Sequence, residues 1–246
     1  MTSYVVYRAS RNVVNRGTIP RELRSLECKQ IRKSLWEVEE EKLDKVLRVL
    51  QKNEPIILRK AREIRKPKWD GQNKVSDLGS LLVVAYNVPK EKRKKINRAI
   101  QKTPCIPLCR AVYAFPQKHS LSDRENNLVA TFLKLTKENH GDVKVMSRMV
   151  IEDQTSVKIL TDEITERIQN ETSEIIASSK VLTHKAEKEN TNRAHFSKSL
   201  TELKKRFSHL KKVMAFYEEW LKMDFSKNLL KTYRAIKKVQ DIIEQK

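Results

Sequence analysis

The chain has 246 residues, of which 52 are Lys or Arg and 31 are Asp or Glu, so its formal net charge is +21. Apolar residues make up 39% of the chain, which is enough to form a buried core and argues against disorder along the whole length. Only four residues are glycine, and this number excludes the glycine-rich loops that bind dinucleotides or nucleotide phosphates. The excess of positive charge favours polyanions as partners.

The hydropathy pattern predicts neither a membrane-spanning segment nor a secretory signal. The longest nearly apolar run, residues 78–88, is too short to cross a bilayer, and residues 1–10 lack a charged stretch followed by an apolar core. The cysteines, Cys28, Cys105 and Cys109, are odd in number in a chain without such a signal. We therefore expect reduced thiols, a cytoplasmic location and no membrane partner.

Positive charge is concentrated in the first part of the chain. Residues 1–150 contain 33 Lys or Arg and 16 acidic residues, a net charge of +17, whereas residues 151–246 contain 19 and 15, a net charge of +4. A balanced segment with helical spacing is typical of solvated helices around an apolar seam. An unbalanced segment is typical of a surface that faces an anionic partner.

Strands and helices are expected in alternation over residues 1–66. An apolar run at residues 4–8 predicts a strand, and Pro20 marks the start of a short helix. The alternating pattern and Trp36 predict a strand over residues 28–38, the helical spacing of Leu43, Val46, Leu47 and Leu50 predicts a helix over residues 39–52, and a closing strand follows at residues 55–59.

The same order recurs in residues 80–152, after a linker at residues 67–79 that contains Pro67, Gly71 and Gly79. Strands are expected at residues 81–86, 106–115 and 143–151, and helices are expected from Pro89 onward and over residues 122–139, with Gly141 as a C-cap. Each unit is therefore expected to have the order β-α-β-α-β, a small sheet with helices on one face. The alternative is a coincidence of common strand and helix orders.

Residues 153–246 contain no Pro or Gly and predict helices. Apolar residues recur at helical spacing in three stripes, at residues 159–176, 200–221 and 229–243. The pattern breaks near Asp224, where Ser226 is the candidate N-cap of the last helix. We expect a helical bundle, and the alternative is a long helix that forms a homodimer.

Two dense basic runs are the candidate contacts with nucleic acid. Cations that share one face of a strand or one flank of a helix can pair with phosphates and displace counterions. The alternatives are an edge strand protected by Lys and a helix kept soluble by its charges. Trp69, beside the first run, could stack on a base or cover an apolar surface. The candidate nucleic-acid-binding residues are Arg59, Lys60, Arg62, Arg65, Lys66, Lys68, Lys92, Arg93, Lys95 and Arg98.

No set of residues predicts an active site. Cys105, Cys109 and His119 supply at most three ligands, whereas a structural zinc ion needs four, so we expect buried thiols instead. Nothing marks the oriented base and oxyanion donors that Cys–His catalysis requires. The acidic residues 39–41 are most simply a favourable helix start. We therefore expect no enzyme activity, no catalytic residues, no metal and no cofactor.

Residues 81–151, read together with the helices up to Lys246, resemble the N-terminal region of chromate-resistance protein B. The likeness lies in a strand followed by Pro89 and a basic helix, in the strand that ends at residues 112–116, and in the aromatic-rich helix end at residues 217–225. The sheet units are also similar to the ferredoxin-like module of phenylacetate-catabolism repressors and CRISPR adaptation nucleases.

The resemblance implies an α+β fold of two tandem ferredoxin-like units followed by a C-terminal helical bundle. The domains are then a first unit at residues 1–66, a linker at 67–79, a second unit at 80–152 and a bundle at 153–246. The adaptation nucleases carry an Asp at the end of the first strand, but Asn87 in the second unit and Arg8 or Ala9 in the first stand there. An amide without neighbouring carboxylates is a poor ligand for a divalent metal, and Arg repels one.

The repressors' helix-turn-helix also has no clear counterpart in this chain. From the excess of positive charge in residues 1–150 and from the resemblance, we expect a non-enzymatic regulator or adaptor that binds nucleic acid, DNA rather than RNA, through the phosphates. The alternatives are a degenerate metal-dependent nuclease and a sensor of an oxyanion such as chromate.

Overall fold

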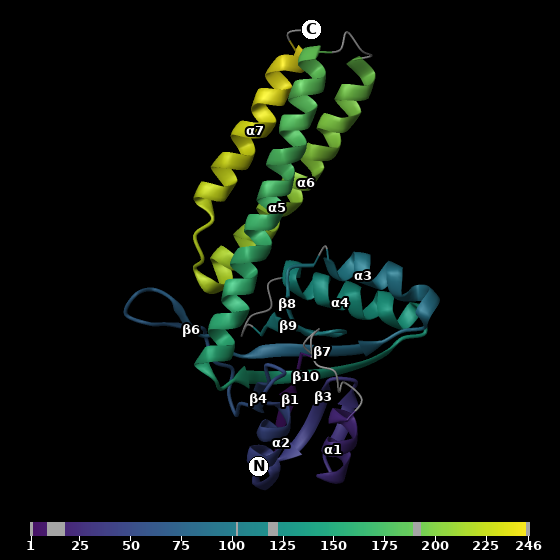
Figure 1. The fold of residues 1–246 in the computed structure, drawn as a ribbon, viewed down its shortest axis with the longest axis vertical. Helices are drawn as coiled ribbons and strands as arrows, with labels where there is room; N and C mark the ends of the chain where they lie inside the picture. The colour runs from purple at the N-terminus through teal and green to yellow at the C-terminus, as the bar shows by residue number, and fades with distance from the viewer. Residues whose placement is uncertain (1, 9–17, 102, 118–122, 189–192, 245–246) are drawn as a thin grey trace. The chain divides into compact units, whose positions relative to one another are not determined.

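The computed structural model describes residues 2–8, 18–101, 103–117, 123–188 and 193–244 (Figure 1). The chain divides into two compact units, Met1–Thr161 and Asp162–Lys246. The first unit contains a large antiparallel sheet with helices, and the second contains helices. The predicted α+β class with a C-terminal helical region is therefore confirmed, while the predicted four-part domain division stays a prediction.

The first half of the sheet contains two helices and four strands. The elements are β1 (Thr2–Val6), α1 (Ile19–Ser25), β2 (Lys29–Arg32), β3 (Leu35–Glu39), a 3₁₀ turn η1 (Glu40–Lys42), α2 (Leu43–Leu50) and β4 (Ile56–Lys60). Pro20 lies in the first turn of α1, where its missing N–H is not needed. The single strand predicted over residues 28–38 is wrong, because the chain turns at Lys33 and Ser34 and returns as β3.

The second half repeats this order. Its elements are β7 (Leu81–Asn87), a 3₁₀ turn η2 (Lys90–Lys92), α3 (Arg93–Gln101), β8 (Ile106–Cys109), β9 (Val112–Pro116), α4 (Asp123–Glu138) and β10 (Asp142–Ile151). The strand predicted over residues 106–115 also splits in two, at a turn where Ala111 has a φ of 65°. Each half thus has the order β-α-β-β-α-β, one strand more than predicted.

The eight strands form one sheet in the order β2-β3-β1-β4-β10-β7-β9-β8, and every neighbouring pair is antiparallel. The last strands of the two halves, β4 and β10, pair in the middle, with Arg59 opposite Val150. The same local order is therefore used twice, and the pairing of the two closing strands joins the halves.

Helices cover one face of each half-sheet. The helices α1 and α2 pack over Val5 and Trp36, and α3 and α4 pack over Val84 and Tyr86. Figure 1 shows α1 and α2 on one side of the strands and α3 and α4 on the other. The strand residues that point away from the helices are buried too, among them Val6, Leu35, Ile56, Leu58, Leu81, Val83, Ala85, Val112 and Ala114.

These buried residues place the two half-sheets face to face around a further core. Alternate strand residues point to opposite faces, so a residue buried on the helix-free face needs cover from the other half-sheet. Arg8, which follows β1, donates hydrogen bonds to the carbonyl oxygens of Leu108 and Pro107 in β8. Arg32 in β2 pairs with Asp142 in β10. The unit is therefore layered as helices, half-sheet, half-sheet and helices.

A short hairpin occupies the predicted linker at residues 67–79. It pairs β5 (Lys68–Trp69) with β6 (Val75–Asp77), and the Asp70 carboxylate accepts hydrogen bonds from two backbone N–H groups within the turn. Gly79, which follows β6, has a φ of 73°, and a Cβ there would lie 2.7 Å from the carbonyl oxygen of Arg65. Only glycine fits this position, because backbone atoms lie in the way.

The end of α4 differs from the prediction. His140 adopts the left-handed conformation, with a φ of 56°, and Gly141 follows it and donates a hydrogen bond to the Thr136 carbonyl oxygen. The residue that reverses the chain is therefore His140 and not Gly141. Position 141 requires glycine for a steric reason, because a Cβ there would lie 2.6 Å from the side chains of Thr136 and Val88.

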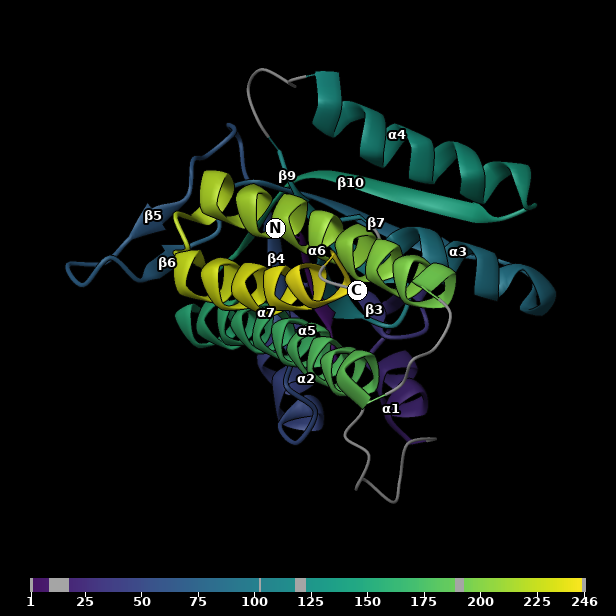
Figure 2. The ribbon, with the colours of Figure 1, turned by 90° about the horizontal axis from the view of Figure 1, so that it is seen from above.

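The second unit is built from α5 (Gln154–Lys188), α6 (Arg193–Leu221) and α7 (Ser226–Glu244), and α5 begins within the first unit. The three helices run side by side (Figure 2), and they bury the predicted apolar stripes, including Ile168, Leu210 and Ile236. Asp224 and not Ser226 supplies the cap of α7, because its Oδ1 accepts a 2.8 Å hydrogen bond from the Ser226 N–H. Among the described helices, none has the length and apolar character needed to cross a bilayer.

Candidate nucleic-acid interface

The first basic run forms an exposed segment that leaves the middle of the sheet. Lys60 ends β4, and the chain then passes through residues 61–67 to the hairpin. We call Lys60, Arg62, Arg65, Lys66 and Lys68 the basic segment, and all five are exposed. Among the residues that the structure describes, no carboxylate lies within ion-pair distance of these side chains. The basic segment therefore presents positive charge that is not balanced by an ion pair to any residue the structure describes.

Backbone hydrogen bonds hold the basic segment in place. The Ala61 N–H donates to the Arg148 carbonyl oxygen at 2.7 Å. The Arg65 N–H donates to Ser80 Oγ at 2.9 Å, and the Arg65 carbonyl oxygen accepts from the Ser80 N–H at 2.9 Å. Because the backbone is already anchored, less backbone entropy is lost when the side chains of the segment bind a partner.

Arg59 differs from its basic neighbours. Its guanidinium pairs with Glu40, its Nε lies 3.0 Å from Glu152 Oε2, and the same Nε donates to Ser3 Oγ at 3.1 Å. The side chain is 27% exposed. Arg59 thus connects β4 to Ser3 in β1 and to Glu152, which follows β10. The charge of Arg59 is balanced by the carboxylates of Glu40 and Glu152. Its contact with nucleic acid stays a prediction.

A shallow hollow of about 310 Å³ adjoins the start of the basic segment. Its walls carry three cationic side chains and two carboxylates. The lining residues are Arg59, Lys60, Ala61, Arg65, Asp77, Val150, Ile151 and Glu152. Because Asp77 and Glu152 face the same space, the hollow is a mixed-charge groove and not a closed anion site.

A bulge in β10 positions the basic segment. The register of β10 against β7 shifts between Met146 and Met149, and Arg148 within the shift has a φ of 58°. Its guanidinium donates to the Arg62 carbonyl oxygen at 2.7 Å, and its N–H donates to the Gln117 side chain. The sequence analysis did not single out Arg148. The sequence signal of the bulge is the broken alternation of apolar and polar residues over 143–151.

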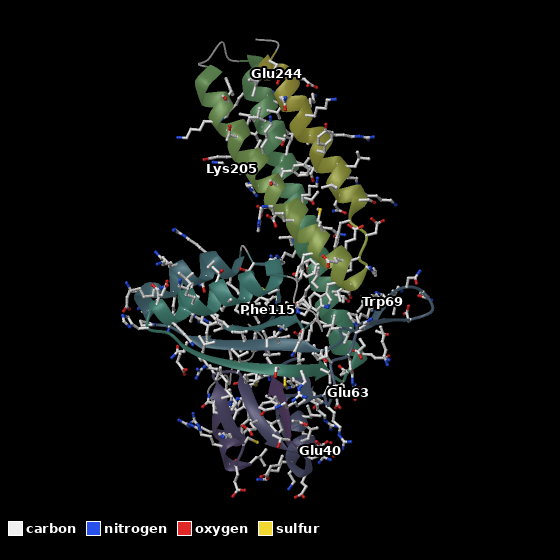
Figure 3. The ribbon with its side chains drawn as sticks, turned by 180° about the vertical axis from the view of Figure 1, so that it is seen from behind. Glu40, Glu63, Trp69, Phe115, Lys205 and Glu244 are labelled. Atoms are coloured by element: carbon white, nitrogen blue, oxygen red, sulfur yellow. The ribbon has the colours of Figure 1, made fainter. Side chains whose placement is uncertain are left out.

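Trp69 is half-buried in β5, next to Lys68, and Figure 3 labels it on the hairpin. The other tryptophans, Trp36 and Trp220, are buried in the two units. Trp69 is therefore the tryptophan closest to the basic segment along the chain and the most exposed of the three. Stacking on a base and cover of an apolar surface remain the two interpretations of this residue.

The second basic run lies on η2 and α3. Lys92, Arg93, Lys95 and Arg98 are exposed, whereas Ile96 and Ile100 are buried beneath them. The Arg93 Nε donates weakly to the Val88 carbonyl oxygen at 3.4 Å. Amphipathic spacing thus places the cations on the outer side of the helix, as the sequence predicts.

The structure keeps the two basic runs apart. The basic segment is bound to Ser80, immediately before β7, whereas Lys90 follows the end of β7. A strand of seven residues spans roughly 20 Å, so the two runs begin at opposite ends of it (Figure 1). The two basic runs therefore form two separate surfaces. A single phosphate backbone that contacts both must be longer than roughly 20 Å.

None of the three cysteines forms a disulfide, and Cys105 and Cys109 have different surroundings. Cys105 packs in the core under α3 and α4, while Cys109 lies near Arg8 of the other half. Burial raises the pKa of the Cys109 thiol to about 12, although the positive charge of Arg8 acts against this rise. His119 lies outside the described residues. Among those described, no three His, Cys, Asp or Glu side chains are placed to hold a metal ion.

The positions that match the nuclease aspartate carry other groups. Asn87 is exposed at the end of β7, opposite Asp142, and Asp142 is paired with Arg32. Arg8 holds the two half-sheets together through Leu108 and Pro107, and Ala9 lies outside the described residues. Asp142, the carboxylate opposite Asn87, therefore already has a cationic partner.

No protein-family model, no curated protein and no solved structure matches this chain. The resemblance to chromate-resistance protein B and to the ferredoxin-like families stays a prediction from the residues quoted above.

Proposed function

We propose that this protein is a non-enzymatic regulator or adaptor that binds nucleic acid, with the basic segment on the phosphate backbone. The observation that carries the proposal is the set of five exposed cations, from Lys60 to Lys68, without a carboxylate partner among the described residues. Exposed, unbalanced cations at this density bind phosphates with little dependence on base sequence. The net charge of +21 supports the same class of partner.

We also propose that each half of the sheet is a ferredoxin-like unit, as the resemblance implies. The strand orders β4-β1-β3-β2 and β10-β7-β9-β8 support this, because both place the first and third strands in the middle. The element order β-α-β-β-α-β, found in both halves, supports it further. A relation to chromate-resistance protein B would then place the protein among regulators.

Two alternatives are less well supported. A metal-dependent nuclease needs carboxylates at the strand ends, but Asn87 and the paired Asp142 occupy one of them. A sensor of a small oxyanion needs a pocket of one sign, but Asp77 and Glu152 line the hollow beside the basic segment. DNA or RNA cleavage that Mg²⁺ or Mn²⁺ stimulates and a chelator stops would establish the nuclease instead.

The test replaces Arg62, Arg65, Lys66 and Lys68 by Gln and measures affinity for duplex DNA, single-stranded DNA and RNA in a series of salt concentrations. We expect weaker binding to every base sequence and a salt slope smaller by about 3 to 4, since each lost phosphate contact removes about 0.9 from the slope on duplex DNA. Stronger binding of the wild type to duplex DNA than to RNA is the expected order.

The matched control replaces Arg21, Lys45, Arg48 and Lys52 by Gln. These four residues are also two Arg and two Lys, and all are exposed on the first half of the chain, on or beside α1 and α2. The control lowers the net charge by the same amount, so it removes any general effect of charge. Equal losses in both variants would contradict a dedicated surface at the basic segment.

A further inference from the structure

Positive charge is unevenly distributed within the C-terminal part of the chain. Residues 193–246 contain fourteen Lys or Arg and six acidic residues, a net charge of +8, whereas residues 151–192 contain five and nine, a net charge of −4. The sum of +4 for the whole part hides this division. The cations therefore gather on α6 and α7, whereas α5 (Gln154–Lys188) is nearly balanced, with five Lys or Arg and six acidic residues.

The structure places α6 and α7 next to each other and exposes their cations. The two helices are joined by residues 222–225 and pack as an antiparallel pair. Lys198, Lys205 and Lys212 follow each other at intervals of seven residues, which is about 10 Å along a helix. The α6–α7 basic face consists of the exposed residues Lys198, Lys204, Lys205, Lys211, Lys212, Lys227, Lys231, Arg234, Lys237 and Lys238 (Lys205 is labelled in Figure 3).

These cations have no described carboxylate within ion-pair distance. The ion pair of α6 that involves the described residues joins Arg206 to Glu174 on α5 at 2.9 Å. Arg206 is half-buried and lies outside the basic face. The lysines of the α6–α7 basic face are therefore exposed cations without an ion pair to any carboxylate that the structure describes.

We propose that the α6–α7 basic face is a second surface that binds the phosphate backbone of nucleic acid. This rests on the proposed function, because both surfaces would contact the same class of polyanion. Cations spread over roughly 20 Å of α6, from Lys198 to Lys212, suit an extended polyanion better than a single small anion. Two binding surfaces in one chain raise the effective affinity for a long nucleic acid.

A membrane surface fits this face less well. An interfacial helix needs an apolar face that can enter the lipid. The apolar residues of α7, Ile236, Val239 and Ile243, are buried within the unit. Among the described residues of α6 and α7, the large apolar side chains that are exposed are Leu230 and Tyr233. Two such side chains among ten cations favour a charged and hydrated partner.

The test is the full-length variant Lys205→Gln/Lys212→Gln, compared with Lys180→Gln/Lys185→Gln on α5. All four lysines are exposed, and both variants remove two charges from the same unit. We measure affinity for a labelled duplex DNA against NaCl concentration, and circular dichroism confirms that each variant keeps its helices. The first variant should reduce the salt slope by about 2, and the α5 variant should leave the slope unchanged.

The outcomes separate this inference from the proposed function. If K205Q/K212Q binds DNA with the wild-type slope while the variant of the basic segment loses affinity, the inference is overturned and the proposed function stands. If the basic-segment variant keeps the wild-type slope while K205Q/K212Q loses slope, the α6–α7 basic face is supported and the basic segment is not the site. Binding of the wild type to phosphatidylserine vesicles but not to DNA overturns both.

Discussion

Arg59 and Lys60 are neighbours in β4 with different surroundings. Arg59 is held by Glu40, Glu152 and Ser3, whereas Lys60 is exposed at the strand end. Replacing Arg59 by Met should lower the free energy of unfolding by about 1–2 kcal/mol, because two partly buried carboxylates lose their cationic partner. Urea unfolding followed by circular dichroism measures this difference.

The matched variant is Lys60→Met. It should change the free energy of unfolding by less than about 0.5 kcal/mol, since no described side chain depends on Lys60. It should weaken DNA binding, because it removes a cation of the basic segment. A variant R59M as stable as the wild type would show that the Arg59 ion pairs contribute nothing to the fold.

Gly141 is required for space at the end of α4. A Cβ at this position would lie 2.6 Å from side-chain atoms of Thr136 and Val88 and 2.7 Å from the Thr136 carbonyl oxygen. Gly141→Ala should therefore destabilise the first unit by about 1–3 kcal/mol. Gly71→Ala is the control, because a Cβ there meets no atom within 4 Å. Equal unfolding midpoints for the two variants would refute the close packing at Gly141.

Asp153 caps α5, and its contribution depends on pH. Partial burial raises the pKa of its carboxyl, but hydrogen bonds from Ser156 and Thr155 outweigh this and lower the pKa below the usual 3.8. A lowered pKa stabilises the fold above the unfolded value of about 3.8 and loses this effect as the pH falls through the folded value.

Asp153→Ala should therefore lower the free energy of unfolding by about 1 kcal/mol at neutral pH. The difference from the wild type should shrink once the pH falls below about 3.8, where the wild-type carboxylate also becomes protonated. Asp153→Asn should lie between Asp153→Ala and the wild type at neutral pH, because an amide oxygen accepts the capping bonds but lacks the charge that strengthens them. Unfolding curves at several pH values decide this, and a loss that does not vary with pH would contradict the role of the charge.

At the scale of elements, the bulge in β10 and the basic segment depend on each other. Arg148 has a φ of 58°, and its guanidinium holds the Arg62 carbonyl oxygen at 2.7 Å. Arg148→Gly removes the side chain without backbone strain, because glycine adopts positive φ freely. Amide hydrogen exchange at residues 61–66 should become about tenfold faster, while exchange in α2 should not change. Unchanged exchange at residues 61–66 would show that the segment is held by its own backbone bonds.

Local patterns in the sequence predict the helices and most strand positions. The spacing of apolar residues indicates which side of a helix is buried, as it does in residues 39–52, in residues 122–139 and along the last three helices. This inference requires only residues that are close together in the sequence. The splitting of two predicted strands could not be foreseen, because the turns at Lys33-Ser34 and Arg110-Ala111 carry no Gly or Pro. The pairing of β4 with β10 joins residues about 90 positions apart, and no local pattern encodes it.

The candidate site, like the fold, was only partly predictable from the sequence. The exposure of Lys60, Arg62 and Lys66 is what a dense charge run predicts. The neutralisation of Arg59 was not predictable, because Glu40 and Glu152 come from distant segments. The positive φ of Arg148 was also not predictable from the sequence, because residues other than glycine rarely adopt this conformation. Charge density along the chain thus locates a surface, but the tertiary fold decides which of its cations are available to a partner.

At the level of the whole molecule, the exposed cations that the structure describes include the basic segment, the outer side of α3 and the α6–α7 basic face. The first two lie at opposite ends of β7 in the first unit, and the third lies in the second unit. Such a distribution suits a long polyanion that contacts several surfaces, and each added surface steepens the dependence of affinity on salt.

The measurement that tests this most directly is the affinity of the wild-type protein for a duplex DNA from about 50 to 200 mM NaCl. The five cations of the basic segment alone predict a slope of log affinity against log salt of about −4.5, and contacts from α6 and α7 make it steeper. A slope near zero, or no binding at the lowest salt concentration, would contradict the proposal that these cations face a phosphate backbone.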